Sequence, residues 1–263
     1  MVADIPEPTH SAHRKVGDGG PFVVWLVWGA LLCGGLLAGN LPLDDASGWS
    51  EWGRLGSSVL LVVAAWLFFL RGRATAASRY LLLIAIGMTL GALGDFFMAG
   101  RLQTLIKLPN PALGGIAAFG LGHAAYIAAC LDAHKRAGLK SRAARWEALL
   151  IWQLIGLVGW YFIVYPTEVD RLQLLRWPAL VYTLLLACTA GMAMSLAVQD
   201  RRFSLLTIGA ALFLLSDLIL AWGMFHGSFP YSREAVWIPY GGGQMLIVYA
   251  TTTARAALCG TKQ

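Results

Sequence analysis

Two aspartates lie inside apolar runs that are long enough to cross a membrane, and the residues around them match. The runs read Ala-Ile-Gly-Met-Thr-Leu-Gly-Ala-Leu-Gly-Asp, ending at Asp95, and Thr-Ile-Gly-Ala-Ala-Leu-Phe-Leu-Leu-Ser-Asp, ending at Asp217. A carboxylate at the centre of a transmembrane helix costs roughly 2.5–3.5 kcal/mol on insertion scales, so such an acid is a candidate functional residue. Two acids in one repeated context make proton chemistry the leading hypothesis.

A few other polar side chains lie well inside the apolar runs and could complete a site with the two acids. His123 and Tyr126 are three residues apart and share one helix face, and Gln244 falls at a comparable depth in the last run. At about 1.5 Å per residue, both acids lie in the outer half of a hydrocarbon core about 30 Å thick, with His123 near its middle. Two carboxyls that share a low-dielectric site cannot both ionise cheaply, so one is expected to hold a proton near neutral pH.

Each of these residues also has a structural interpretation. A buried aspartate can simply tie helices together, a helical histidine can be a hydrogen-bonded packing residue, and Gln244 fits a structural role at least as well as a catalytic one. No two histidines have metal-ligand spacing on a central helix, and the sequence contains no CxxC, Gly-x-Ser-x-Gly or P-loop motif. We therefore expect no metal and no cofactor.

The elements that must position these residues are predicted to be membrane-spanning helices. The chain is 58% hydrophobic and 13% charged, against about 25% charged for a soluble domain. Long apolar runs predict an all-α polytopic membrane protein with eight transmembrane helices, at 22–40, 54–70, 79–98, 112–131, 147–165, 175–197, 203–224 and 235–258. Residues 1–20 are polar and predict a flexible cytoplasmic tail, followed by a single transmembrane domain over 21–263.

The matched aspartate segments fall on the third and seventh predicted spans, which run in the same direction. Gly122-His123 in the fourth span and Gly243-Gln244 in the eighth are 121 residues apart, nearly the same offset as the 122 residues between the two aspartates. This pattern suggests two four-helix halves, 21–140 and 141–263, related by a parallel repeat.

Basic residues are distributed unevenly between the two sides of such a bundle. In the eight-helix arrangement, 14 of the 20 basic residues fall on the side that holds both chain ends. The positive-inside rule then predicts cytoplasmic termini, with contacts to anionic membrane lipids and no nucleic-acid partner. The Ala-, Gly- and Arg-rich composition is typical of a GC-rich bacterial genome and favours a bacterial inner membrane.

Four short motifs, in order along the chain from about residue 80, resemble the YhhN family, which includes the TMEM86 lysoplasmalogenases. They are Gly94-Asp95, Phe119-Gly-Leu-Gly-His123-Ala-Ala-Tyr126, Leu212-Phe-Leu-Leu-Ser216-Asp217-Leu-Ile-Leu-Ala221, and Pro239-Tyr240 with Gly243-Gln244. The resemblance implies an eight-helix hydrolase that cleaves the vinyl ether bond of lysoplasmalogen without a cofactor. The products would be a fatty aldehyde and a glycerophosphoethanolamine or glycerophosphocholine.

This chemistry fits the polar residues, because a protonated aspartate can act as a general acid and an ionised one can stabilise a cation. We expect Asp95 and Asp217 to form the acid–base pair and His123 to tune or relay protons. The groups expected to orient or bind the substrate are Tyr126, Ser216, Tyr240 and Gln244.

Two other functions stay open from the sequence alone. A proton-coupled lipid or small-molecule transporter could use the same acids, although its repeats are often inverted rather than parallel. A membrane scaffold without catalysis is the third hypothesis, and it predicts that neither aspartate is needed. The physiological lipid and the oligomeric state are not determined by the sequence.

Overall fold

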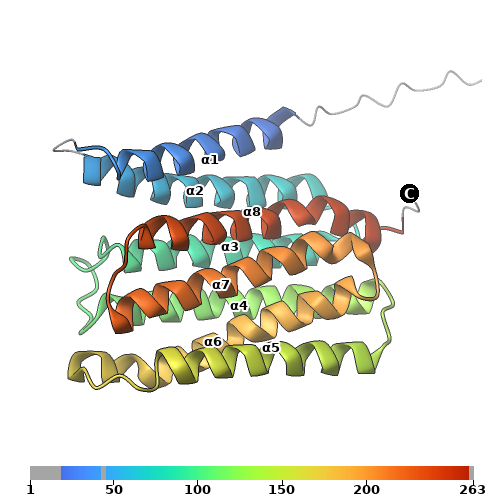
Figure 1. The fold of residues 1–263 in the computed structure, drawn as a ribbon. Helices are drawn as coiled ribbons and strands as arrows, with labels where there is room; N and C mark the ends of the chain where they lie inside the picture. The colour runs from blue at the N-terminus through green and yellow to red at the C-terminus, as the bar shows by residue number, and fades with distance from the viewer. Residues whose placement is uncertain (1–18, 43–45, 261–263) are drawn as a thin grey trace, which may run out of the picture.

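The computed structural model describes residues 19–42 and 46–260, and every element in these two ranges is helical. In chain order (Figure 1) they are α1 (Gly19–Ala38), α2 (Ala46–Gly72), α3 (Ser78–Met98), α4 (Pro111–Arg136), α5 (Arg142–Ile163), α6 (Asp170–Ala197), the short 3-10 helix η1 (Arg201–Phe203), α7 (Ser204–His226) and α8 (Ser232–Leu258). The predicted all-α class is therefore confirmed for the described residues. The predicted tail over 1–20 lies almost wholly outside them.

The helices form a bundle in which consecutive helices pack as hairpins. The closest packing joins α1 with α2, α3 with α4, α5 with α6, and α7 with α8. Helix α1 begins and α8 ends at the same end of the bundle (Figure 1), which we call the terminal end. The connections that follow α1, α3, α5 and α7 lie at the opposite end.

Seven helices in the described part of the chain, α1 to α7, are long and apolar enough to cross a membrane, which indicates an integral membrane protein. Helix α8 is not among the seven, although it has 27 residues and packs within the bundle against α7, α2 and α3. Its polar residues, which include Gln244, Thr251 and Arg255, lower its hydropathy. Eight helices are thus observed, while the eighth crossing and the parallel repeat stay predictions.

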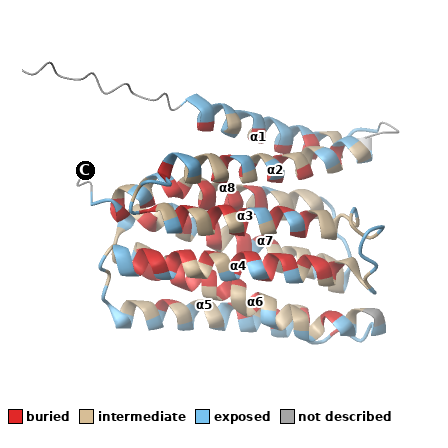
Figure 2. Cartoon of the chain, turned by 180° about the vertical axis from the view of Figure 1, so that it is seen from behind, coloured by how far each residue is buried: buried red, intermediate tan, exposed pale blue. Residues whose placement is uncertain are grey.

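The outer helices expose large apolar side chains, as expected for surfaces that face lipid. Figure 2 shows long exposed stretches on α1 and α5, whereas α3 and α4 are mostly buried. Among the exposed residues are Phe22 and Trp25 on α1, and Leu150 and Phe162 on α5. In water such faces would drive association, but in a bilayer they need no partner.

Helix α2 begins eight residues before the predicted span. The prediction began the span at Arg54 and counted Glu51 and Arg54 among the charged residues of the side opposite the chain ends. In the structure the helix continues through both residues to Ala46, and both line a cavity instead of facing lipid. The helix therefore extends beyond Arg54, the charged residue at which the predicted span begins.

Glycines in the matched aspartate segments lie where helices approach closely. A Cβ atom on Gly122 of α4 would lie 3.0 Å from the carbonyl oxygen of Gly87 on α3, and one on Gly243 of α8 would lie 2.8 Å from that of Gly209 on α7. Small residues permit such backbone contacts between membrane helices. The Ile-Gly pair that precedes each aspartate thus sets the helix crossing that positions it.

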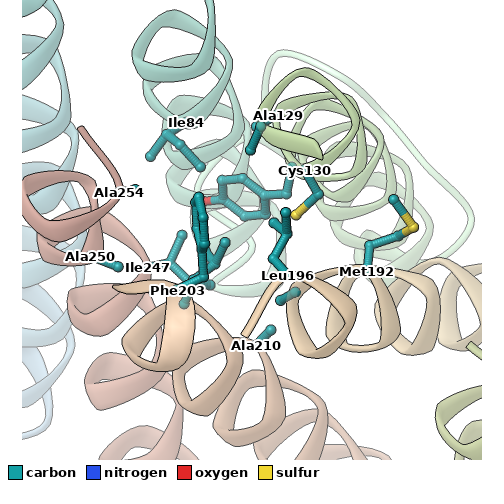
Figure 3. Close-up of a cluster of buried hydrophobic side chains, with 14 of the residues drawn as sticks. Ile84, Ala129, Cys130, Met192, Leu196, Phe203, Ala210, Ile247, Ala250 and Ala254 are labelled. Carbon is teal, nitrogen blue, oxygen red and sulfur yellow. The ribbon is translucent and has the colours of Figure 1, made fainter. Parts of the chain in front are cut away.

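An apolar core fills the half of the bundle nearer the terminal end. Figure 3 shows side chains from six helical elements meeting there, with Phe203 of η1 fully buried among them. The other labelled members are Ile84, Ala129, Cys130, Met192, Leu196, Ala210, Ile247, Ala250 and Ala254. The half of the bundle near the terminal end is thus densely packed, whereas polar residues line a cavity in the opposite half.

Candidate functional site

Asp95 lies in the last turn of α3 and is 5% exposed. Its Oδ1 accepts a hydrogen bond of 2.6 Å from the hydroxyl of Tyr240 on α8. The Nε2 group of Gln244, one turn further along α8, donates to that hydroxyl at 2.6 Å. Asp95 Oδ2 has no hydrogen-bond partner within the described part of the chain. One oxygen of this carboxyl is thus fixed by α8, and the other is buried without a hydrogen bond that meets the usual distance, with the Ser58 side chain of α2 beside the carboxyl.

Asp217 lies on α7, is partly buried, and has a different set of partners. The hydroxyl of Tyr182 on α6 donates to its Oδ2. The Ser216 hydroxyl, which donates to the Phe213 carbonyl at 2.7 Å, lies 3.2 Å from the Oδ1 atom of Asp217. Both oxygens of Asp217 therefore have a hydroxyl neighbour, of which Tyr182 donates to the carboxyl while Ser216 gives its hydrogen to Phe213.

Both carboxyl groups line one cavity of about 310 Å³. They are also close enough to interact electrostatically. The cavity lies near the end of the bundle opposite the chain termini, because its walls come from the beginnings of α2 and α8 and the ends of α3 and α7. Its remaining lining residues are Glu51, Arg54, Leu55, Met98, Ala99, Phe119, Leu220, Val236, Trp237 and Tyr240.

Aromatic rings form the inner wall between the two acids. The centroid of the Phe119 ring lies 6.2 Å from those of both Tyr182 and Tyr240, which carry the hydroxyls bound to Asp217 and Asp95. Phe213 packs edge-on against Tyr240 at 5.1 Å. A Cβ atom at Gly94 would lie 2.8 Å from the Phe119 ring. The glycine before Asp95 thus makes room for the ring that separates the acids.

A second, mostly apolar cavity adjoins the first among α4, α5, α6 and α7. The two cavities share Met98, Phe119, Asp217 and Leu220. Beyond these, the second is lined mainly by aliphatic and aromatic side chains, such as Ile116, Trp160, Leu175 and Phe225. Asp217 is therefore at the junction of a polar chamber and an apolar one.

His123 does not line either cavity. It is 1% exposed, and its Nδ1 lies 3.0 Å from the hydroxyl of Thr189. When that hydroxyl donates to the Leu185 carbonyl, Nδ1 carries the hydrogen of the neutral ring, and Nε2 has no partner among the described residues. The ring packs edge-on against Phe213 at 4.7 Å. His123 thus lies behind the aromatic wall.

The other residues that the sequence singled out fall into two groups. Tyr240 lines the polar cavity. Ser216 is buried beside the Asp217 carboxyl, and Gln244 is buried beside the Tyr240 hydroxyl that donates to Asp95. Tyr126 is buried beside His123, with its hydroxyl directed at the sulfur of Met88 at 3.9 Å. The structure therefore brings Asp95, Asp217, Tyr240, Ser216 and Gln244 together and sets His123 and Tyr126 apart.

Three cavity residues, Arg54, Phe119 and Tyr182, were not assigned to the site from the sequence. Phe119 stands in a motif that carries the family resemblance, and Tyr182 is a polar residue inside the predicted span 175–197. Arg54 is a charged residue at the start of an apolar run, and the sequence prediction uses it only to assign the two sides of the membrane. Across the described residues, no group of three or more His, Cys, Asp or Glu side chains could hold a metal ion.

Comparison with known proteins agrees with the motifs. The YhhN family matches residues 53–251, which include both aspartates and all of α3 to α7. No solved structure matches the chain. Helix α1 and the first turns of α2 lie outside the matched residues.

Proposed function

The chain belongs to the YhhN family, which includes lysoplasmalogenases, and from this membership and the geometry of its cavity we propose that it hydrolyses the vinyl ether bond of a lysoplasmalogen. The products are a fatty aldehyde and a glycerophosphoethanolamine or glycerophosphocholine. One observation carries the proposal. Two carboxyl groups with different hydrogen-bond partners line a single cavity inside the bundle.

Asp95 is the general acid in this proposal. Its Oδ1 is held by Tyr240, and its Oδ2 makes no hydrogen bond in the described residues, so we assign the transferable proton to Oδ2, which a small shift of the carboxyl would bring to the cavity that Asp95 lines. Vinyl ether hydrolysis begins when this proton bonds to the β-carbon through the π electrons of the double bond. The positive charge that forms is shared between the α-carbon and the ether oxygen.

Asp217 is the anion that stabilises this oxocarbenium ion, because Tyr182 donates to one of its oxygens and the carboxyl lies where the polar cavity meets the apolar one. Water adds to the α-carbon and transfers a proton to Asp217, which leaves a hemiacetal. The hemiacetal then collapses, with its hydroxyl proton lost and the glycerol oxygen protonated as it leaves. One water molecule is consumed, and the net return of a proton from Asp217 to Asp95 restores both groups.

The rings around the acids also favour this reaction. Phe119 and Tyr240 line the cavity together with both carboxyls, and the negative face of an aromatic ring attracts a cation. The adjoining apolar cavity suits the alkenyl chain. His123 does not reach the cavity, so we propose that it positions the wall through Phe213 and Tyr182 and transfers no proton to the substrate.

The test is to identify the products and the origin of their atoms. Purified protein in nanodiscs is given 1-alkenyl-lysophosphoethanolamine in D₂O and, separately, in H₂¹⁸O, and the aldehyde is reduced to the alcohol as it forms to prevent exchange. We expect one deuterium at carbon 2 of the aldehyde, ¹⁸O at carbon 1, and no ¹⁸O in the glycerophospho product. Incorporation of ¹⁸O into the glycerol part would contradict this mechanism. Lipid transfer between leaflets with no aldehyde would instead identify a transporter.

A further inference from the structure

Arg54 is a charged residue of the polar cavity that the proposed reaction does not use. It lies on α2, half-buried, and its Nε donates to the carbonyl of Ser50 at 3.0 Å. Its guanidinium carbon lies 5.1 Å from the centre of the Trp237 ring on α8. These two contacts hold the side chain in the wall of the chamber that both aspartates line.

The nearby carboxylates leave this guanidinium without an ion pair. Glu51, one turn earlier on α2, is bound by Arg101, with 2.5 Å between Nε and Oε1. Glu234 is bound by Arg233 at 3.3 Å and by Asn40, and Arg233 is close enough to repel Arg54. In the described part of the chain, no ion pair includes Arg54 and no acceptor is assigned to its two terminal nitrogens.

Glu51, Glu234 and Asp95 also lie close enough to attract this guanidinium, but none of them pairs with it. A cation without an ion pair in the wall of a membrane bundle favours an anionic ligand. Terminal guanidinium nitrogens match the spacing of two oxygens of a phosphate group and bind them in a bidentate manner. The ligand must also fit both cavities, because the polar cavity continues past Asp217 into the apolar one. A molecule that fills both spaces has an anion at one end, an apolar chain at the other, and its reactive bond near the acids.

We propose that Arg54 binds the phosphate of the headgroup of a single-chain phospholipid whose chain extends past Asp217 into the apolar cavity. This inference rests on the proposed function for the identity of the chain, while the anion site stands on the contacts of Arg54. The three-carbon glycerol unit separates the phosphate from the ether oxygen. The Trp237 ring and the Ser50 carbonyl position the guanidinium, and Arg101 offsets the charge of Glu51, which would otherwise repel the phosphate.

The experiment measures binding without catalysis. A saturated 1-alkyl-lysophosphocholine, which lacks the vinyl ether and cannot be cleaved by this route, is titrated into the protein in nanodiscs and compared with 1-alkylglycerol, which lacks the phosphate. We expect Arg54→Gln to weaken binding of the phospholipid by about tenfold or more and to leave binding of the alkylglycerol unchanged. Arg54→Lys should fall between the two, because it keeps the charge and loses the bidentate geometry.

Arg176→Gln is the matched control. Arg176 also donates to a backbone carbonyl, that of Thr167, and lies over an aromatic ring, that of Tyr165, but it lines neither cavity. Unchanged phospholipid binding in Arg54→Gln, or equal losses for both ligands, would overturn the proposal. Inorganic phosphate at millimolar concentration should not displace the phospholipid, and displacement that depends on Arg54 would indicate a site for free phosphate instead. A protein that binds as expected but releases no aldehyde would refute the proposed hydrolysis alone.

Discussion

Each of the two carboxyl groups accepts a hydrogen bond from a tyrosine, the buried Tyr240 for Asp95 and the partly buried Tyr182 for Asp217. The two tyrosines come from α8 and α6, and the Phe119 ring lies between them. The acids differ at their second oxygen, which in Asp95 is buried and makes no hydrogen bond within the described residues, and in Asp217 lies next to Ser216. This asymmetry assigns the acid and the anion in the proposed reaction.

Removal of the Tyr182 hydroxyl tests the role of Asp217 as an anion. Tyr182→Phe keeps the ring packed on Phe119 and takes one donor from the carboxylate. A hydrogen bond to a charged group contributes about 1.5–3 kcal/mol, so we expect kcat to fall about tenfold or more while KM changes little. Tyr161→Phe on the exposed face of α5 is the control and should match the wild type. Equal kcat values for Tyr182→Phe and wild type would remove Tyr182 from the mechanism.

At the scale of the helix, the two aspartates owe their positions to close crossings two turns away. Gly87 and Gly122 meet between α3 and α4, and Gly209 and Gly243 meet between α7 and α8. Because the obstacle at each crossing is partly backbone, a side chain cannot be accommodated by a change of rotamer. The angle between the two helices would have to change, and this change would move the carboxyl that the same helix carries.

We therefore expect Gly209→Ala to destabilise the protein and to lower aldehyde release. Its Cβ would lie 2.7 Å from the Gly243 carbonyl oxygen, and overpacking of this kind typically costs about 1–3 kcal/mol. Gly223→Ala on the same helix is the control, because a Cβ there meets nothing within 4 Å. Thermal unfolding and turnover of both variants provide the comparison. If the two variants behave alike, the crossing does not position Asp217.

Much of this arrangement follows from the sequence, and the parts that do not have physical reasons. Apolar run length predicts the helices, and the cost of charge in lipid identifies Asp95 and Asp217. Helical spacing relates residues on one helix but does not reveal which helices are neighbours, so it paired His123 with Tyr126 and missed that Tyr182 faces Asp217. The sequence prediction also placed the start of a span at Arg54, because a sequence does not distinguish a charge that faces a cavity from a charge that faces water.

For the whole molecule, the cavity lies at the end opposite the terminal end, and 14 of the 20 basic residues fall on the terminal side by the sequence assignment. By the positive-inside rule, we expect the cavity end to face away from the cytoplasm. Two reporters in a background with the other cysteines replaced by alanine test this: the exposed native Cys259 near the end of α8, and Ser228→Cys in the exposed connection after α7.

An impermeant maleimide added to intact cells whose outer membrane has been removed should label Ser228→Cys at once and Cys259 only after lysis. The opposite labelling pattern would place the cavity on the cytoplasmic side. It would also assign the substrate to the inner leaflet of that membrane. Labelling of both reporters before lysis would contradict a membrane crossing by α8, which lies between them.

The central claim is that Asp95 delivers the proton that starts vinyl ether cleavage. Asp95→Asn keeps the shape of the side chain and an acceptor for Tyr240 but removes the acidic proton. The measurement is single-turnover aldehyde release from 1-alkenyl-lysophosphoethanolamine at saturating protein, with thermal unfolding as the check that the variant is folded. We expect a loss of about 10²–10⁴-fold, the usual contribution of a general acid. A folded Asp95→Asn protein that releases aldehyde at close to the wild-type rate would contradict the account.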